Sequence, residues 1–230
     1  VPSGINASTG ACMGAAVRAA VTVTFVGLKQ GLVIGDALDC RGELIFNSLD
    51  IPPAVYETVP ATAKLEKYVS ASQRLRPRSR IAHKGDYGHV LVIGGAPGYS
   101  GAVRMTAEAA ARTGAGLVSV GTHPIHAPTV AQIRPELMCH AISTPDDLRP
   151  LLQRATVVAV GPGLGVTDWS SALFAVVRDC KHPLVLDADG LNLLADDPDF
   201  RETRIITPHL GEASRLLGMT VEDIRADRFS

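Results

Sequence analysis

Residues 91–118 read LVIGGAPGYSGAVRMTAEAAARTGAGLV and decide the fold of this chain. The stretch predicts a buried strand, a glycine-rich loop, a helix of small residues and the start of a second strand. Gly94, Gly95, Gly98 and Gly101 fall within eight positions. Glycines this dense let backbone N–H groups approach a ligand closely, and the positive end of the following helix points at the same loop. The stretch therefore predicts a site for an anion or a nucleotide.

The two common phosphate-binding motifs do not fit this loop. From Gly95 the spacing is G-x-x-G-x-x-G, whereas the dinucleotide fingerprint is G-x-G-x-x-G, and no lysine follows the glycines as it does in a P-loop. A tight strand-to-helix turn without a ligand is therefore the alternative interpretation.

From His83 onward, apolar runs of strand length alternate with segments of helical pattern. The runs are continuous, which is typical of parallel strands covered on both faces. The predicted fold is α/β, a doubly wound, mostly parallel sheet with helices on both faces. The predicted strands are Val90–Ile93, Leu117–Val120, Val157–Val160, Leu184–Leu186 and Ile205–Thr207, and the predicted helices are Gly101–Thr113, Pro145–Arg154, Asp168–Cys180, Leu191–Ala195 and Gly211–Leu217.

Glycines or short polar residues follow every predicted strand. Ligands of doubly wound sheets bind beyond the carboxyl ends of the strands, so these ends predict a cleft lined by backbone amides and a few side chains. In GPGLG, Gly161, Gly163 and Gly165 leave amides free to face a phosphate or carbonyl, and a plain turn is the alternative. The strand ends are Gly94–Gly98, Gly121–His123, Gly161–Gly165, Asp187–Gly190 and Thr207–His209.

Asp187 and Asp189 flank one alanine, and Asn192 follows them. A D-x-D pair predicts Mg²⁺ binding through oxygen ligands. Alternatively, Asp189 caps a helix that begins at Leu191. Asp187 lies at the strand tip and is expected to face the cleft.

Histidines occur at two of the strand ends. His209 precedes a helix and can donate a hydrogen bond to a ligand there, while Glu212 in the first turn favours the helix dipole. His123 and His126 have the spacing of metal ligands, but no third ligand follows nearby, so a metal site is not favoured.

A serine hydrolase is a rival interpretation. Gly98–Ala102 reads G-x-S-x-A, close to a nucleophile elbow, and Ser100, Asp187 and His209 occur in the hydrolase order. Ser100 serves equally well as the N-cap of its helix, and GPGLG has no role in a hydrolase.

Composition excludes several classes of partner. The chain has 230 residues, of which 20% are charged, and a formal net charge of −1. No global basic field is therefore expected to attract nucleic acid or an anionic membrane, and no apolar run reaches the length of a membrane span. The 4 cysteines are scattered, which predicts reduced thiols in a cytoplasmic protein.

The first part of the chain has a different character. Residues 1–57 predict a helix at Cys12–Ala19 and strands at Val21–Val26 and Gly42–Phe46, too little to bury a core. Residues 58–82 predict a solvated linker. In that linker arginines alternate with Leu, Pro and Ser, at Arg74, Arg76, Arg78 and Arg80. A nucleic-acid patch is not favoured because no aromatic residues are interleaved.

Four segments in order resemble the ADP- or ATP-dependent NAD(P)H-hydrate dehydratases, of the ribokinase-like superfamily. They read HKGDYGHVLVIGGAPGYSGAVRMTAEAAARTGAGLVSV, VAVGPGLG, LVLDADGLNLL and IITPHLGEASRLLG, and the resemblance covers residues 83–230. VPSGINASTG and the segment AVRAAVTVTFVGLKQGLVIGDALDCRGELIF resemble the end of an NAD(P)H-hydrate epimerase domain. Residues 1–57 would then be part of a Rossmann-like epimerase domain fused ahead of the dehydratase.

The resemblance implies nicotinamide nucleotide repair. The epimerase would interconvert the R and S hydrates of NAD(P)H. The dehydratase would use ADP or ATP with Mg²⁺ to phosphorylate the hydroxyl of the S hydrate, and phosphate elimination would restore NAD(P)H. It also implies a homo-oligomer for the full-length protein. A ribokinase-like small-molecule kinase is the alternative within this fold.

The resemblance also implies roles for single residues. The hydrate would contact Ala102, Gly163 and His209, Asp187 and Asn192 would line the same cleft, and Ser3 would bind potassium in the epimerase tail. The family's G-T-G-D motif, with its catalytic aspartate, is absent, and the epimerase aspartate would stand before Val1. The sequence is therefore expected to be a fragment truncated at both ends that contains no catalytic residue and catalyses neither reaction.

Overall fold

The computed structural model describes residues 1–66 and 77–229. The chain forms two compact units, which are described separately. The larger unit spans Arg78–Gly218, and the smaller one comprises Val1–Pro77 and the segment from Met219 onward. Arg74 and Arg76 of the predicted linker lie outside the described residues.

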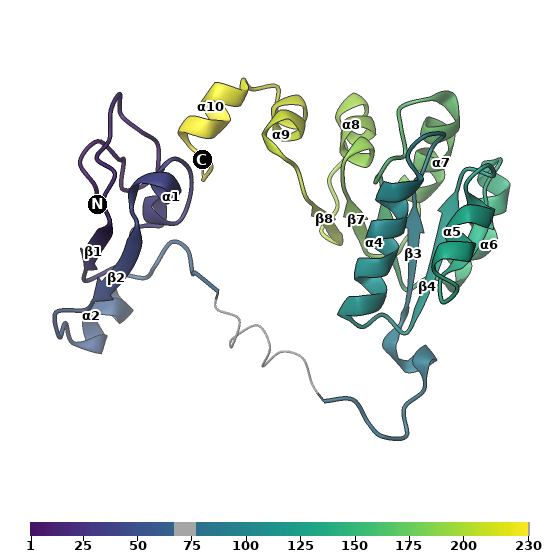
Figure 1. Ribbon diagram of the computed structural model, residues 1–230, viewed down its shortest axis with the longest axis horizontal. Helices are drawn as coiled ribbons and strands as arrows, with labels where there is room; N and C mark the ends of the chain where they lie inside the picture. Colours follow the sequence, from purple (N-terminus) through teal and green to yellow (C-terminus); the bar gives the residue numbers. More distant parts are fainter. Residues whose placement is uncertain (67–76, 230) are drawn as a thin grey trace. The chain divides into compact units, whose positions relative to one another are not determined.

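The larger unit contains a six-stranded parallel sheet in the order β5-β4-β3-β6-β7-β8 (Figure 1). The central strand β3 follows a short 3-10 helix, η2 (Lys84–Tyr87). Because all six strands run in the same direction, their carboxyl ends meet at one edge of the sheet. The strands are β3 (His89–Ile93), β4 (Leu117–Thr122), β5 (Met138–Ala141), β6 (Val157–Val160), β7 (Leu184–Leu186) and β8 (Arg204–Ile206).

Helices cover both faces of this sheet, which confirms the predicted doubly wound α/β fold. Alternate strand residues point to opposite faces. Leu91 of β3 packs into a core with side chains of α6, α7 and α8, whereas Val92 packs with Val103 and Ala107 of α4. The helices are α4 (Ser100–Thr113), α5 (Ala127–Ile133), α6 (Pro145–Arg154), α7 (Asp168–Arg178), α8 (Asp189–Asp196) and α9 (Leu210–Leu217).

The five predicted strands are confirmed, but α5 and β5 were not predicted from the sequence. β5 is an edge strand of four residues, MCHA, with no continuous apolar run. At the other edge, β8 leaves Ile205 63% and Ile206 44% exposed. Edge strands bury fewer side chains, so their sequences carry a weaker pattern.

The smaller unit has a parallel pair of strands, β1 (Val21–Phe25) and β2 (Glu43–Asn47). The predicted helix at Cys12–Ala19 is wrong, because this segment is irregular and Cys12 forms an isolated bridge with Ile5. A Cβ on Gly4 would lie 1.8 Å from the carbonyl oxygen of Ala15, so the two backbones pack too closely for side chains. The short helices of this unit are η1 (Gln30–Leu32), α1 (Ala37–Cys40), α2 (Pro53–Thr58) and α10 (Val221–Ala226).

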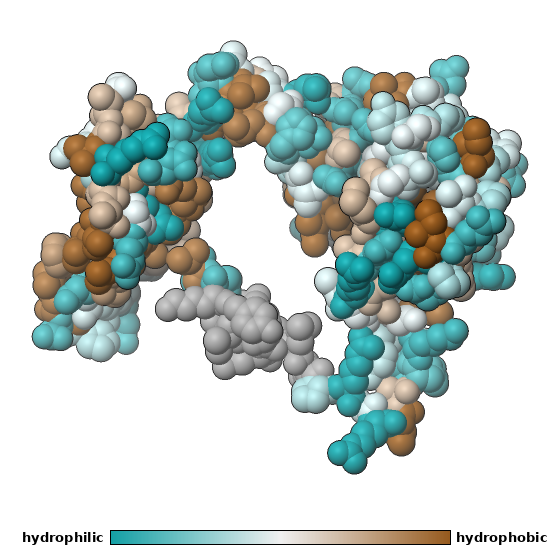
Figure 2. All heavy atoms as spheres, viewed as in Figure 1, coloured by the Kyte–Doolittle hydropathy of each residue, from teal (hydrophilic) through white to brown (hydrophobic). Residues whose placement is uncertain are grey.

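The smaller unit has a small core and an apolar surface. Its described core cluster contains Ile5, Ala37 and Cys40. Alternate residues of β1 are exposed, namely Val21, Val23 and Phe25, and brown apolar side chains lie over this unit in Figure 2. This agrees with the expectation that residues 1–57 cannot bury a sizeable core. Of the helices in the described part of the chain, none is long and apolar enough to cross a bilayer.

Candidate functional site at the carboxyl edge of the sheet

The two glycine loops are joined backbone to backbone. The N–H of Gly95 donates to the carbonyl of Pro162 at 3.2 Å, and the N–H of Ala96 donates to Gly163 at 2.7 Å. A Cβ on Gly94 would lie 2.2 Å from the Pro162 oxygen, so this approach requires glycine. The loops predicted separately from the sequence therefore form one continuous surface.

Residues after β4 hold the first loop in place. The buried hydroxyl of Thr122 donates to the carbonyl of Gly95 at 3.0 Å. Nε2 of His126 accepts the N–H of Gly98 at 3.1 Å. His126 thus supports the loop, a role that the sequence analysis missed because it considered this residue only as a metal ligand.

His123 also contacts another side chain of the protein rather than a metal site. Its ring packs edge-on against Trp169 with centroids 5.4 Å apart, and the Trp169 indole donates to the carbonyl of Ile142. Within the described ranges, no cluster of three or more His, Cys, Asp or Glu residues could hold a metal ion.

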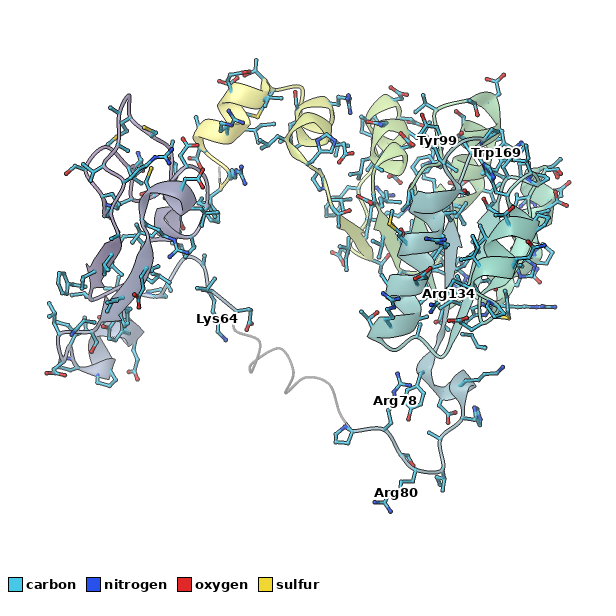
Figure 3. The ribbon with its side chains drawn as sticks, in the orientation of Figure 1. Lys64, Arg78, Arg80, Tyr99, Arg134 and Trp169 are labelled. Carbon is cyan, nitrogen blue, oxygen red and sulfur yellow. The ribbon has the colours of Figure 1, made fainter. Side chains whose placement is uncertain are left out.

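Ala102 and Gly163, the two expected hydrate contacts in the glycine loops, lie close together. A Cβ on Gly163 would be 3.2 Å from Cβ of Ala102 and 2.7 Å from Cβ of Tyr99. Tyr99 is exposed at the start of α4, on the same edge of the unit as Trp169 (Figure 3). Gly163 has φ +62°, a conformation that a larger residue would adopt only with strain.

The first turn of α4 presents unpaired donors. The predicted N-cap role of Ser100 is wrong, because the helix begins at Ser100 and its N-cap is Tyr99, with no side-chain hydrogen bond. No acceptor among the described residues pairs with the backbone N–H groups of Ser100, Gly101 and Ala102. These groups, at the positive end of a 14-residue helix, can bind an anionic or carbonyl oxygen beside Gly163.

Asp187 and Asp189, the acidic pair after β7, have different hydrogen-bond partners. Oδ1 of Asp187 accepts the Thr207 hydroxyl at 2.9 Å. Oδ2 of Asp189 accepts the N–H of Gly165 at 2.8 Å, and its Oδ1 accepts Nδ2 of Asn192 at 3.2 Å. The alternative that Asp189 caps a helix beginning at Leu191 is wrong, because α8 begins at Asp189 itself. The two carboxylates therefore bind protein groups and do not form a ready-made Mg²⁺ site.

His209 is the N-cap of α9. Its Nδ1 accepts the N–H of Gly211 at 3.0 Å, and its Nε2 lies 3.0 Å from Oε1 of the buried Glu212. The other carboxylate oxygen of Glu212 accepts the N–H of His209 at 2.9 Å. The helix-end role of Glu212 is thereby confirmed. The His209 side chain is 69% exposed, so the face of its ring is open to a ligand although both ring nitrogens bond within α9.

This arrangement contains no catalytic triad. Both ring nitrogens of His209 are engaged within α9, and the Asp187 carboxylate bonds to Thr207 instead of a histidine. The edge thus supplies backbone donors and short polar side chains.

Two cavities lie away from this edge. One of about 430 Å³ lies between α6 and α7, and the other of about 410 Å³ lies between α4 and β6, near Thr106 and Ala159. Neither includes a residue of the two glycine loops.

His89 lies at the opposite end of β3 from the glycine loops. Its Nε2 is 2.8 Å from Oγ of Ser119, and burial lowers the pKa of this imidazole. Burial also lowers the pKa of His140, and the charge of Arg154 adds to that effect. These histidines belong to the packing of the sheet.

Comparison with known proteins identifies the family. Residues 90–229 match the model of the NAD(P)H-hydrate dehydratase family. The chain belongs to this family. It is 52% identical over 229 residues to a bifunctional NAD(P)H-hydrate repair enzyme from Coxiella burnetii, covering 100% of this chain and 47% of that protein. This dehydratase-family chain therefore spans about half the length of the curated relatives that it matches.

Solved structures support the same fold for the dehydratase-family chain. A ribokinase-like superfamily protein from Enterococcus faecalis is 27% identical, with a TM-score of 0.59, covering 64% of this chain and 54% of that one. An ADP/ATP-dependent NAD(P)H-hydrate dehydratase from Bacillus subtilis, co-crystallised with ATP and Mg²⁺, is 27% identical, with a TM-score of 0.57, covering 67% and 56%.

Proposed function

We propose that the protein carrying this chain repairs hydrated NAD(P)H. It dehydrates the S hydrate at the expense of ADP or ATP, and its epimerase domain interconverts the R and S hydrates. The observation that carries this proposal is the close approach of Gly163 to Ala102, beside the unpaired amides of α4. The curated relatives that match the whole chain are named as bifunctional repair enzymes.

The side chains at the edge suit the binding and orientation of a hydrate. Ala102 and Gly163 supply a surface of small residues, and the exposed ring face of His209 is proposed as a third contact. Asp187 and Asn192 line the same edge. Phosphoryl transfer depends mainly on positioning and on stabilising charge, which backbone donors can provide.

At this edge, Asp187 is the carboxylate that we propose for the nucleotide's Mg²⁺. Mg²⁺ usually keeps several waters and is bound by substrate phosphates with one or two carboxylates. Asp187, whose Oδ1 bonds to Thr207, has its second carboxylate oxygen to offer. The ion would neutralise phosphate charge.

Potassium binding in the epimerase tail is proposed for Ser3. The carbonyl of Ser3 accepts the N–H of Val17 at 2.9 Å, which leaves its exposed hydroxyl for a cation. A cytoplasmic location and a homo-oligomeric full-length protein complete the proposal.

The test is an assay of NADPH recovery from its S hydrate by the full-length protein with ADP or ATP and Mg²⁺. We expect reduced-nicotinamide absorbance to return with release of phosphate. A stable phosphorylated product would instead show a small-molecule kinase. The 230-residue chain alone, which lacks the G-T-G-D motif, is expected to give no recovery. Recovery by this chain would overturn that expectation.

A fluorophosphonate probe tests the rival hydrolase. No labelling of Ser100 is expected, because neither His209 nor Asp187 is hydrogen-bonded to it. Specific labelling of Ser100 would favour the hydrolase.

A further inference from the structure

We propose that Asp189 is a positioning residue that fixes the shape of the Gly161–Gly165 loop, and that Asn192, itself held by Arg215, orients its carboxylate. This inference rests on the proposed function, because the loop contains the expected hydrate contact Gly163.

A chain of side-chain contacts connects the loop to α9. Asp189 Oδ2 accepts the N–H of Gly165 at 2.8 Å, and Asp189 Oδ1 accepts Nδ2 of Asn192 at 3.2 Å. Asn192 Oδ1 then accepts Nη1 of Arg215 at 2.6 Å. Arg215 thus bonds to Asn192, Asn192 bonds to Asp189, and Asp189 alone accepts the Gly165 amide.

We call Asp189, Asn192 and Arg215 the clamp. The loop needs these hydrogen bonds because it is rich in glycine. Gly161, Gly163 and Gly165 all have positive φ values, of 122°, 62° and 73°. Glycine loses more conformational freedom on folding than any other residue, so a loop of this kind keeps one shape only if its polar groups are tied. The Ser170 hydroxyl donates to the carbonyl of Leu164 at 2.7 Å. Asp189 accepts the N–H of the next residue, Gly165.

The bonding of Asp189 separates this role from the two that the sequence suggested. Each carboxylate oxygen already accepts a hydrogen bond within the protein, which orients the carboxylate toward the loop. The side chain also caps no helix, because α8 starts at this residue. A hydrogen bond from a backbone N–H to a carboxylate is stronger than one between neutral groups, which suits a fixed loop.

The first readout is the Gly165 amide in NMR spectra of the ¹⁵N-labelled 230-residue chain. Asp189→Ala is expected to move this resonance upfield and speed its hydrogen exchange, and Arg215→Ala should move it in the same direction by less. Arg149→Ala is the matched control, since Arg149 on α6 bonds to Asp146 one turn away. An unchanged Gly165 resonance in Asp189→Ala would overturn the proposal.

The second readout is binding of NADPH, followed by its fluorescence. Loss of a charge-assisted bond in Asp189→Ala is expected to weaken binding about tenfold. Asp189→Asn keeps a carbonyl that accepts the Gly165 N–H, so it should restore binding to within about threefold and also remain folded if the alanine variant does not. Equal loss in both variants, with Gly165 unmoved in Asp189→Asn, would show a direct ligand contact and overturn the positioning role.

The two readouts separate this inference from the proposed function. If the unmodified chain fails to bind NADPH while Asp189→Ala and Arg215→Ala still shift Gly165, the clamp is supported and recognition of a reduced nicotinamide nucleotide by this chain is contradicted. If NADPH binds and no variant shifts Gly165, the function is supported and the clamp fails.

Discussion

The backbone N–H of Ala96 donates to the carbonyl of Gly163 at 2.7 Å, so loops that are 67 positions apart in the chain share a hydrogen bond. This bond joins the end of β3 to the end of β6, and those strands are themselves neighbours in the sheet. The expected hydrate surface is therefore a direct extension of the sheet's two central strands.

Adding one methyl group at Gly94 should separate the two loops. A Cβ there would lie 2.2 Å from the carbonyl oxygen of Pro162, which belongs to the backbone and cannot rotate away. We expect Gly94→Ala to lower the free energy of unfolding by about 1–3 kcal/mol, measured by urea denaturation.

Gly101→Ala is the matched control for that substitution. A Cβ at Gly101 would meet nothing within 4 Å, and the residue lies in the first turn of α4. Because alanine favours helix over glycine, this variant should be unchanged or more stable by up to about 1 kcal/mol. Equal destabilisation of both variants would contradict the close approach of the loops.

His126→Ala should loosen the first glycine loop without unfolding the sheet. The substitution removes Nε2, the acceptor of the Gly98 N–H. Faster hydrogen exchange is expected at Gly98, while exchange at Val92 in the buried strand stays slow. Unaltered exchange at Gly98 would rule out His126 as the support of this loop.

Stability should fall as the pH decreases below about 6.5, the pKa of histidine in an unfolded chain. Burial lowers the pKa values of His89 and His140 in the folded chain. The unfolded chain therefore binds more protons in this window, so the stabilisation present above pH 6.5 is lost as the pH falls toward the folded pKa values.

The corresponding variant is His89→Asn, combined with His140→Asn. Urea denaturation between pH 7 and pH 5.5 should show a shallower loss of stability for the double variant than for the unmodified chain. Identical pH slopes would mean that these two imidazoles do not control the effect.

The cysteines should differ in reactivity. Burial raises the pKa of the Cys139 thiol, which lowers its thiolate fraction at pH 8, whereas Cys12 is exposed. A thiol reagent such as DTNB should modify Cys12 first and Cys139 much more slowly in the native chain. Cys12→Ser should remove the fast phase, and persistence of that phase would contradict this assignment.

The sequence predicted the central sheet because its strands are buried on both faces and appear as continuous apolar runs. It did not reveal β5 because MCHA, at the edge, has no such run. The segment Cys12–Ala19 resembled a helix in composition, but the backbone contact between Gly4 and Ala15 is a tertiary feature without a local pattern.

The candidate site, too, could be predicted from the sequence only in part. The glycine loops follow from their composition and from the rule that parallel strands end at one edge, whereas Ala102 and Gly163 were named only through the family resemblance. The acceptor roles of His126 and Asp189 depend on partners 28 and 24 positions away, which no short motif contains. Whether Asp189 caps α8 depends on the residue at which that helix begins, and helix boundaries are the least certain part of a prediction from sequence.

The exposed edge strand β8 has a consequence for the chain in concentrated solution. Its outer backbone groups border no further strand in the described sheet, and Ile205 and Ile206 add apolar surface beside them. Such an edge is a template for pairing with another molecule. Self-association should therefore rise with protein concentration, and a lysine in place of Ile205 should suppress it by placing like charges opposite each other.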